Sequence, residues 1–209
     1  MQIVLFAGPE SLTLVRGRPF VDWQLDRFVA SGARSVVMCV GEQGEEIETH
    51  VRRALDRGLT VGYSYAGEQR AGTGGALRRA FARLEDDFVL TYGDRYLPFD
   101  YSAPLLELRA HPEAVGAMTV CHRPGRVALD GAWVTRYDDA PSGLADCGIA
   151  ALRRSALADI EDGAVWPIEA LFRKLTRLGK LRAFTAPEPD LAVNSPELER
   201  YLGGLSELP

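Results

Sequence analysis

Three glycines and one aspartate of this chain occupy positions where a protein commonly binds a phosphorylated ligand. Asp94 follows the apolar run in DFVLTYGD, and a carboxylate at the end of a strand is a suitable ligand for Mg²⁺. Gly8 follows the apolar run QIVLFA, where a glycine lets the backbone wrap around the phosphates of a nucleotide. Gly72 and Gly74 lie in AGTGGA, at the start of a predicted helix, where the backbone can approach a ligand closely. These residue types suit a nucleotide site, and the alternative readings are an aspartate that caps the turn after Gly93 and a glycine-rich start of a helix.

The elements that must position these residues alternate between strand and helix in the first half of the chain. Apolar or β-branched runs fall at 2–6, 35–41, 59–66 and 87–94, and helical patterns at 20–33, 45–58 and 74–84. Such alternation predicts a parallel, doubly wound sheet, in which ligands bind at the carboxyl ends of the strands. This rule selects Ala7-Gly8, Gly41-Glu42, the 66–75 loop and Gly93-Asp94.

The second half predicts a mixed extension of the same sheet. We expect strands or apolar runs at 114–122, 132–139, 145–154, 181–186 and 190–194, and an amphipathic helix at 166–179. A last helix begins at Ser195-Pro196-Glu197, because serine is favoured at the N-cap and proline at the first helical position. No linker rich in proline, serine or glycine divides the chain, so we expect one α/β domain over 1–209, with three layers and a mostly parallel mixed sheet.

Composition argues against several classes of protein. The net charge of −5 argues against a nucleic-acid surface. Apolar runs are too short for a membrane span, and the N-terminus lacks the features of a signal peptide, which favours a cytoplasmic protein. Cys39, Cys121 and Cys147 are scattered without a CxxC motif, so they predict reduced, buried thiols and no zinc site.

Six segments, in order along the chain, resemble the sugar-1-phosphate nucleotidyltransferase family. They are GRPFVDWQLDRFVASGARSVVMCVG (17–41), AGTGGALRRAF (71–81), FVLTYGDRYLPFDY (88–101), DCGIAALRR (146–154), WPIEALFRKLTRLGKLRAF (166–184) and VNSPELERYL (193–202). The resemblance implies a Rossmann-like fold of the GT-A type, with a nucleotide-binding half at 1–100 and a sugar-binding half with the C-terminal helix at 101–209. It also implies that a nucleoside triphosphate and a sugar 1-phosphate react to give a nucleotide sugar and pyrophosphate.

The resemblance assigns roles to individual residues. Those expected to contact the nucleotide are Ala7, Gly8, Glu68, Gly72, Thr73 and Gly74. Asp146 and Gly148 match the family's sugar-binding turn, and Asp94 matches a ligand of Mg²⁺.

The chain departs from the family's pattern after the first strand. The segment PESLTLVR at 9–16 stands in place of a longer glycine-rich loop that holds phosphates in the family. Pro9 lacks an N–H donor, and Glu10 adds a negative charge. Arg16 is the sole candidate here for the family's catalytic arginine.

Two further departures concern charge. Ala192 stands where the family has its second metal-binding aspartate, and Asp190 lies two residues earlier on the same face of the strand. Asp139 stands where the family has a lysine that contacts the sugar phosphate. Arg95 either supplies positive charge to the site or fills the metal's place with its guanidinium.

Two functions remain open from these residues. The chain is either a sugar-1-phosphate nucleotidyltransferase of nucleotide-sugar metabolism, or a catalytically degenerate relative that binds a ligand or a partner in a regulatory role. Glycosyl transfer is a weaker third reading, because no DxD motif is present. The expected ligands are a nucleotide or nucleotide sugar and a sugar 1-phosphate, and apolar surface in 120–180 is consistent with a homodimer or a partner protein.

Overall fold

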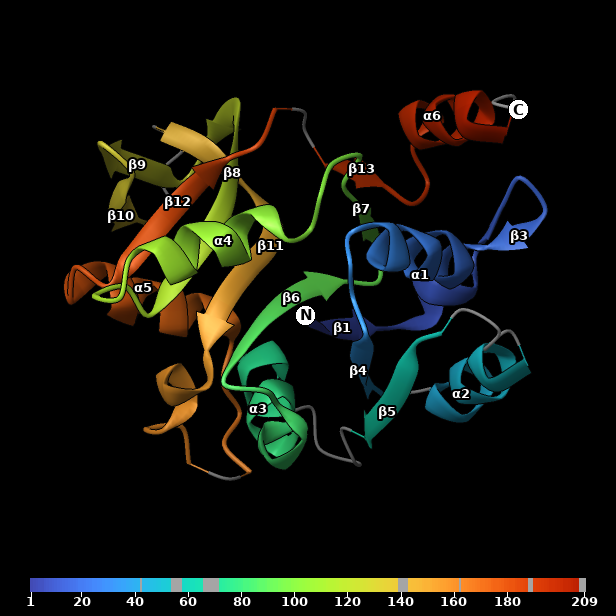
Figure 1. Ribbon diagram of the computed structural model, residues 1–209, viewed down its shortest axis with the longest axis horizontal. Helices are drawn as coiled ribbons and strands as arrows, with labels where there is room; N and C mark the ends of the chain where they lie inside the picture. The colour runs from blue at the N-terminus through green and yellow to red at the C-terminus, as the bar shows by residue number, and fades with distance from the viewer. Residues whose placement is uncertain are drawn as a thin grey trace.

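Within the part of the chain that the structure describes, the strands form a nine-stranded main sheet and two small sheets (Figure 1). The computed structural model describes residues 1–41, 43–53, 58–65, 72–138, 143–161, 163–187 and 190–206. The strands of the main sheet are β1 (Gln2–Ala7), β4 (Ser35–Val40), β5 (Thr60–Tyr65), β6 (Asp87–Tyr92), β8 (Gly116–Gly125), β9 (Val127–Asp130), β10 (Trp133–Tyr137), β11 (Gly143–Arg153) and β12 (Leu181–Thr185). The small sheets pair β2 (Leu14–Val15) with β3 (Arg18–Pro19), and β7 (Arg95–Tyr96) with β13 (Leu191–Ala192).

Helices cover both faces of the main sheet. The α-helices are α1 (Phe20–Ala30), α2 (Gly44–Arg53), α3 (Gly72–Arg79), α4 (Ala103–Ala110), α5 (Ile168–Arg177) and α6 (Pro196–Ser206). Short 3₁₀ turns are η1 (Pro9–Leu12), η2 (Phe81–Arg83) and η3 (Arg154–Leu157).

The order of strands in the main sheet is β5-β4-β1-β6-β11-β8-β12-β10-β9. The first four strands in this order pair in parallel, as the alternating pattern of the first half predicts. β11 pairs antiparallel with both β6 and β8, whereas β12 returns to a parallel pairing with β8. The sheet is therefore mixed and runs without interruption through both halves of the chain, which confirms the predicted fold class.

The hydrophobic core has two layers, one on each face of the sheet. Buried side chains of α1, α2 and α4 pack on one face, and Phe28 and Ile47 are fully buried there. Buried side chains of α3 and α5 pack on the other face, around Leu77 and Leu171. Each helix presents an apolar stripe to a strand surface whose side chains alternate between the two faces. The result is the predicted three-layer arrangement.

A third, smaller cluster holds α6 beside the turn between β1 and α1. Leu198 and Leu202 of α6 pack with Val15 and Phe20. The hydroxyl of Ser195 accepts a hydrogen bond from the Leu198 amide at 3.2 Å, which confirms the predicted N-cap. No helix within the described residues is long and apolar enough to cross a membrane.

Candidate functional site

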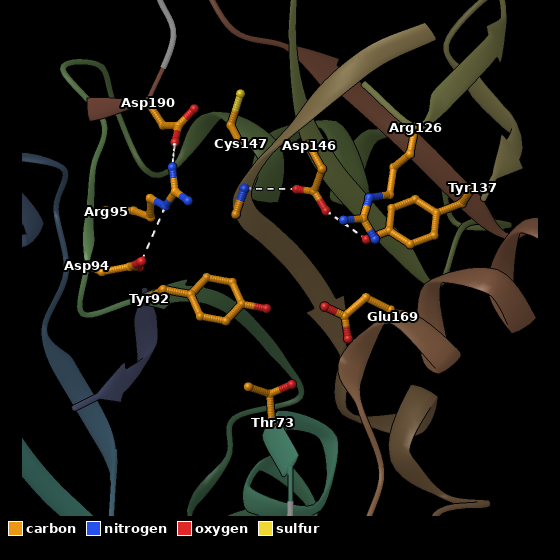
Figure 2. A pocket seen from close by; sticks show the side chains of 11 residues that line it. Thr73, Tyr92, Asp94, Arg95, Arg126, Tyr137, Asp146, Cys147, Glu169 and Asp190 are labelled. Atoms are coloured by element: carbon orange, nitrogen blue, oxygen red, sulfur yellow. Dashed lines mark hydrogen bonds and ion pairs between the residues drawn. The ribbon is translucent and has the colours of Figure 1, made fainter. Parts of the chain in front are cut away.

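A pocket of about 280 Å³ lies where β6 ends and β11 is bent (Figure 2). One side of the pocket is the carboxyl end of β6, and α/β folds commonly bind ligands at the carboxyl ends of their strands. The lining residues come from α3, the end of β6, β7, β10, β11, α5 and neighbouring loops: Thr73, Tyr92, Asp94, Arg95, Arg126, Tyr137, Asp146, Cys147, Gly148, Glu169 and Asp190.

Four residues predicted from the sequence meet in this pocket. Thr73 comes from α3, Asp94 follows β6, and Asp146 and Gly148 belong to β11. These positions are far apart in the chain. The antiparallel pairing of β11 with β6 brings Asp146 and Gly148 to the side of Asp94, and Thr73 reaches the pocket from α3. Their roles toward a ligand stay predictions, but their shared location agrees with the resemblance that selected them.

Asp146 reaches the pocket because β11 is irregular at this point. Its register with β8 shifts between Asp146 and Ala150, and Gly148 adopts a left-handed φ of 72°. Such irregularities re-aim side chains at functional sites. Gly148 also approaches the ring of Tyr92 so closely that a Cβ would lie 3.2 Å from it, so a larger residue would crowd the pocket wall.

The Asp146 carboxylate is held by two hydrogen bonds. The Gly148 amide donates to Oδ1 at 2.8 Å, and the Tyr137 hydroxyl donates to Oδ2 at 3.0 Å. Burial raises the pKa of Asp146, and these two donors, with the charge of Arg126, offset part of that rise. Asp146 is therefore positioned as a fixed acceptor, and it takes up a proton at a higher pH than an ordinary carboxyl group.

Aromatic and acidic side chains complete this side of the pocket. Burial raises the pKa of Tyr92 and of Tyr137, so both phenols are neutral at physiological pH. Glu169 lies in the first turn of α5 and faces the pocket. Neutral phenols and carboxylates at a pocket wall suit the hydroxyl groups of a sugar, because they supply both donors and acceptors.

Charged side chains that form consecutive ion pairs line the opposite side of the pocket. Arg95 Nε lies 3.5 Å from Asp94 Oδ2, and Arg95 Nη1 lies 2.6 Å from Asp190 Oδ2. Arg123 pairs with the other oxygen of Asp190. Figure 2 shows the Arg95 side chain between the carboxylates of Asp94 and Asp190.

This arrangement does not fit a resident Mg²⁺. The ion needs nearly octahedral oxygen ligands at about 2.0–2.1 Å, and waters usually supply several of them. Here a cationic guanidinium occupies the space between the two carboxylates, and both oxygens of Asp190 already pair with arginines. The prediction of a metal at Asp94 therefore has no support from the charges around it.

The predicted glycine-rich segment packs against α5. The amides of Gly74 and Gly75 both donate to the Trp166 carbonyl, at 2.8 and 3.1 Å, and the Thr73 hydroxyl accepts from the Ile168 amide at 3.1 Å. A Cβ at Gly72 or Gly74 would lie 2.8 Å from the Trp166 oxygen. The glycines thus allow close contact between α3 and α5, and this contact places Thr73 and Glu169 on the pocket.

Side chains of the segment that follows β1 occupy the space beside Gly8 and Gly93. Ala7 is buried in β1, and Gly8 does not line the pocket. The Glu10 carboxylate folds against Gly8, where a Cβ would lie 2.5 Å from Oε1. Ser11 is fully buried beside Gly93, and its hydroxyl has no hydrogen-bond partner among the described residues.

Arg16 lies away from the pocket. It adopts a left-handed φ of 54°, and its guanidinium contacts Gly203 of α6. The structure therefore does not bring the predicted catalytic arginine together with Asp94 and Asp146. Glu68, the remaining predicted nucleotide contact, lies outside the described residues.

Sequence reasoning missed five lining residues, namely Tyr92, Arg126, Tyr137, Cys147 and Glu169. Tyr92 and Cys147 adjoin predicted site residues in YGD and DCG, and this adjacency was the available signal. Arg126, Tyr137 and Glu169 reach the pocket only through long-range packing of their elements.

No family model matches the chain. Among curated proteins, it is 35% identical over 98 residues to the bifunctional protein GlmU of Rhizobium etli (strain CIAT 652), a match that covers 46% of the chain and 20% of the relative. The chain thus spans about a fifth of that relative's length. It is 25% identical over 196 residues to the N-acetylmuramate alpha-1-phosphate uridylyltransferase of Caulobacter vibrioides, covering 86% of the chain and 80% of the relative.

Solved structures match along almost the whole chain. HddC from Yersinia pseudotuberculosis, complexed with GMP-PN, has a TM-score of 0.78 and 18% identity, and the match covers 99% of both chains. The inositol-1-phosphate CTP transferase from T. maritima has a TM-score of 0.79 and 14% identity, and the match covers 99% of this chain and 96% of that one. The chain therefore has the nucleotidyltransferase fold throughout and a sugar-1-phosphate nucleotidyltransferase among its sequence relatives, which confirms the predicted family resemblance.

Proposed function

We propose that the chain is a sugar-1-phosphate nucleotidyltransferase-like protein of nucleotide-sugar metabolism. The observation that carries this proposal is the meeting of Thr73, Asp94, Asp146 and Gly148 in one pocket. Thr73, Asp146 and Gly148 were selected from the sequence for a nucleotide or sugar role, and Asp94 lies with them although the charges around it do not suit the metal role that was expected of it. A relative that transfers uridylyl groups to a sugar 1-phosphate supports the same reaction class.

The pocket offers different chemistry on its two sides. Asp146, Tyr137 and Glu169 present acceptors and a neutral phenol to the hydroxyls of a sugar. On the opposite side Arg95 presents positive charge to a phosphate group, and Arg126 adds positive charge beside Asp146 and Tyr137 (Figure 2). In the proposed reaction a phosphate oxygen of the sugar 1-phosphate attacks the α-phosphorus of the nucleoside triphosphate, and pyrophosphate leaves. The arginines would stabilise the negative charge that gathers in this step.

A second candidate is ligand binding without turnover. It is favoured by the charges that surround the expected phosphate position: Glu10 folds against Gly8, and Arg95 is engaged by Asp94 and Asp190. A triphosphate would meet the Glu10 carboxylate after β1, which disfavours the three phosphates together. A nucleotide sugar or sugar phosphate carries fewer negative charges and meets less repulsion. In this form the protein would regulate a pathway or a partner.

We include in the proposal a cytoplasmic location, because the cytoplasm supplies both nucleoside triphosphates and sugar phosphates. A homodimer, or a complex with a partner protein through 120–180, stays a prediction.

A pyrophosphate-release assay separates the two candidates. Four nucleoside triphosphates are tested with glucose, mannose and heptose 1-phosphates, for the wild type and the Asp146→Asn and Asp130→Asn variants. Asp130 is the exposed last residue of β9 and serves as the matched control. Turnover that is lost in Asp146→Asn and kept in Asp130→Asn supports the transferase.

Binding supplies the other half of this test. Nucleotide-sugar binding without turnover supports the second candidate. If the wild type shows neither turnover nor binding of any of these ligands, both candidates are wrong.

A further inference from the structure

The charge cluster beside Asp94 is the feature of the pocket that the proposed reaction leaves unexplained. Arg95 contacts two carboxylates at once, through Nε toward Asp94 and through Nη1 toward Asp190. The Asp190 side chain is 2% exposed, whereas the Arg95 side chain is 41% exposed. A buried carboxylate with two guanidinium partners is a fixed anchor, and it holds the Arg95 head at the pocket wall.

The cluster is already balanced in charge. Asp94 and Asp190 contribute two negative charges, and Arg95 and Arg123 contribute two positive charges. A divalent cation that entered between the carboxylates would stand beside the Arg95 guanidinium and would be repelled by it. It would also find both oxygens of Asp190 engaged.

The thiols behind Asp190 do not provide an alternative metal site. Cys121, Cys147 and Asp190 have ligand atoms within 4.8 Å of one another, but Arg123 Nε donates to the Cys121 sulfur at 3.3 Å. Burial raises the pKa of Cys147, which keeps that sulfur protonated, and a thiol must lose its proton to bind a metal. The local chemistry therefore favours the guanidinium over a metal ion.

Arg95 retains donor capacity that faces the pocket. A guanidinium has five N–H groups, and only Nε and Nη1 pair with carboxylates among the described residues. Figure 2 shows its remaining nitrogen on the side of the pocket where Tyr92 and Asp146 lie. A phosphate group seated there would accept charge-assisted hydrogen bonds from Arg95.

We infer that the Arg95 guanidinium takes the place of a divalent cation in this pocket, so that it binds the phosphate of a ligand directly and without a metal. The identity of that ligand as a sugar phosphate or nucleotide rests on the proposed function. The exclusion of the metal rests on Arg95 and Arg123 and on the carboxylates of Asp94 and Asp190, and it does not depend on the proposed function.

The first experiment uses Mn²⁺ alone as the probe, detected by electron paramagnetic resonance. The wild type is expected to show no saturable binding below about 1 mM. Arg95→Ala releases Asp94 and one oxygen of Asp190, and is expected to bind Mn²⁺ at least tenfold more tightly. Adding Asp94→Asn to Arg95→Ala should remove the gain. Arg109→Ala is the matched control, because Arg109 pairs with Asp87 at the opposite end of β6. The inference is wrong if the wild type binds Mn²⁺ at submillimolar concentration and Asp94→Asn abolishes this binding. That result can be obtained even if the Arg95 variants do not fold.

The second experiment measures the affinity of inorganic pyrophosphate by calorimetry, with and without EDTA. The wild-type affinity is expected to change less than twofold with EDTA and to fall at least tenfold in Arg95→Ala. A tenfold loss on adding EDTA, or no binding of pyrophosphate to the wild type, contradicts direct binding by Arg95. The Mn²⁺ experiment contains no sugar or nucleotide, so failure of the proposed function would leave its result unaffected.

Discussion

Gly74→Ala is expected to destabilise the protein, although alanine favours helices. A Cβ at position 74 would lie 2.8 Å from the Trp166 oxygen, and ordinary contacts of this kind begin at 3.4 Å. The segment before α5 must therefore retreat from α3. The retreat stretches the two hydrogen bonds that the Trp166 carbonyl accepts from Gly74 and Gly75.

The size of the effect follows from these contacts. Two weakened hydrogen bonds cost about 1 kcal/mol each, with some further cost from the residual clash. The higher helix propensity of alanine offsets up to about 1 kcal/mol of this destabilisation. The net loss is about 1–2 kcal/mol, and for a chain of this length each kcal/mol lowers Tm by about 2–4 °C.

Urea and thermal denaturation measure this loss, with Gly62→Ala in β5 as the matched control. A Cβ at Gly62 would meet no atom within 4 Å, so that variant should be as stable as the wild type or more stable. Because Thr73 and Glu169 lie on either side of the strained contact, ligand affinity should also fall in Gly74→Ala. A Gly74→Ala protein at least as stable as the wild type would show that the α3–α5 contact is not as tight as described.

Two other variants probe the acidic residues of the pocket. Asp190→Asn weakens the ion pairs that Asp190 makes with Arg95 and Arg123. Because both arginines are partly exposed and can be hydrated, the free energy of unfolding in urea should fall by only about 1–3 kcal/mol. An unchanged free energy of unfolding would mean that Asp190 does not anchor the two arginines. Asp146 has a raised pKa in the folded state, so between its unfolded and folded pKa values the folded protein binds more protons. The stability of the wild type relative to Asp146→Asn should therefore fall as pH rises through this window and stay constant above it. A pH series of urea titrations measures this difference, and the opposite trend would contradict the buried environment of Asp146.

Periodic patterns predicted the elements that have a clear apolar face. The start of α6 followed from Ser195-Pro196, and the parallel strands of the first half followed from β-branched runs between helices. The helix α4 was not predicted. Its segment APLLELRA gives no clean stripe, because Leu105 and Leu108 are buried whereas Leu106 is 63% exposed, and packing on β8, β11 and β12 is what stabilises it.

Short sequence motifs predicted some residues of the candidate site. Residues that reach the site only through tertiary packing were not predicted. Asp94, Asp146 and Gly148 were selected from short segments that resemble a known family. The irregularity that turns Asp146 into the pocket depends on pairing with β8, which no local sequence pattern reveals. Asp190 was expected to be displaced from a metal position, and its connection to Asp94 through Arg95 depends on how the segment before β13 lies against β7.

The most direct test of the account is a calorimetric titration of uridine, cytidine, guanosine and thymidine diphosphate sugars into the wild type, Asp146→Asn and Asp130→Asn. We predict that at least one of them binds the wild type, that Asp146→Asn weakens its affinity at least tenfold, and that Asp130→Asn leaves it unchanged. If no nucleotide sugar binds the wild type, or if Asp146→Asn binds as tightly as the wild type, this pocket is not the site of a nucleotide sugar.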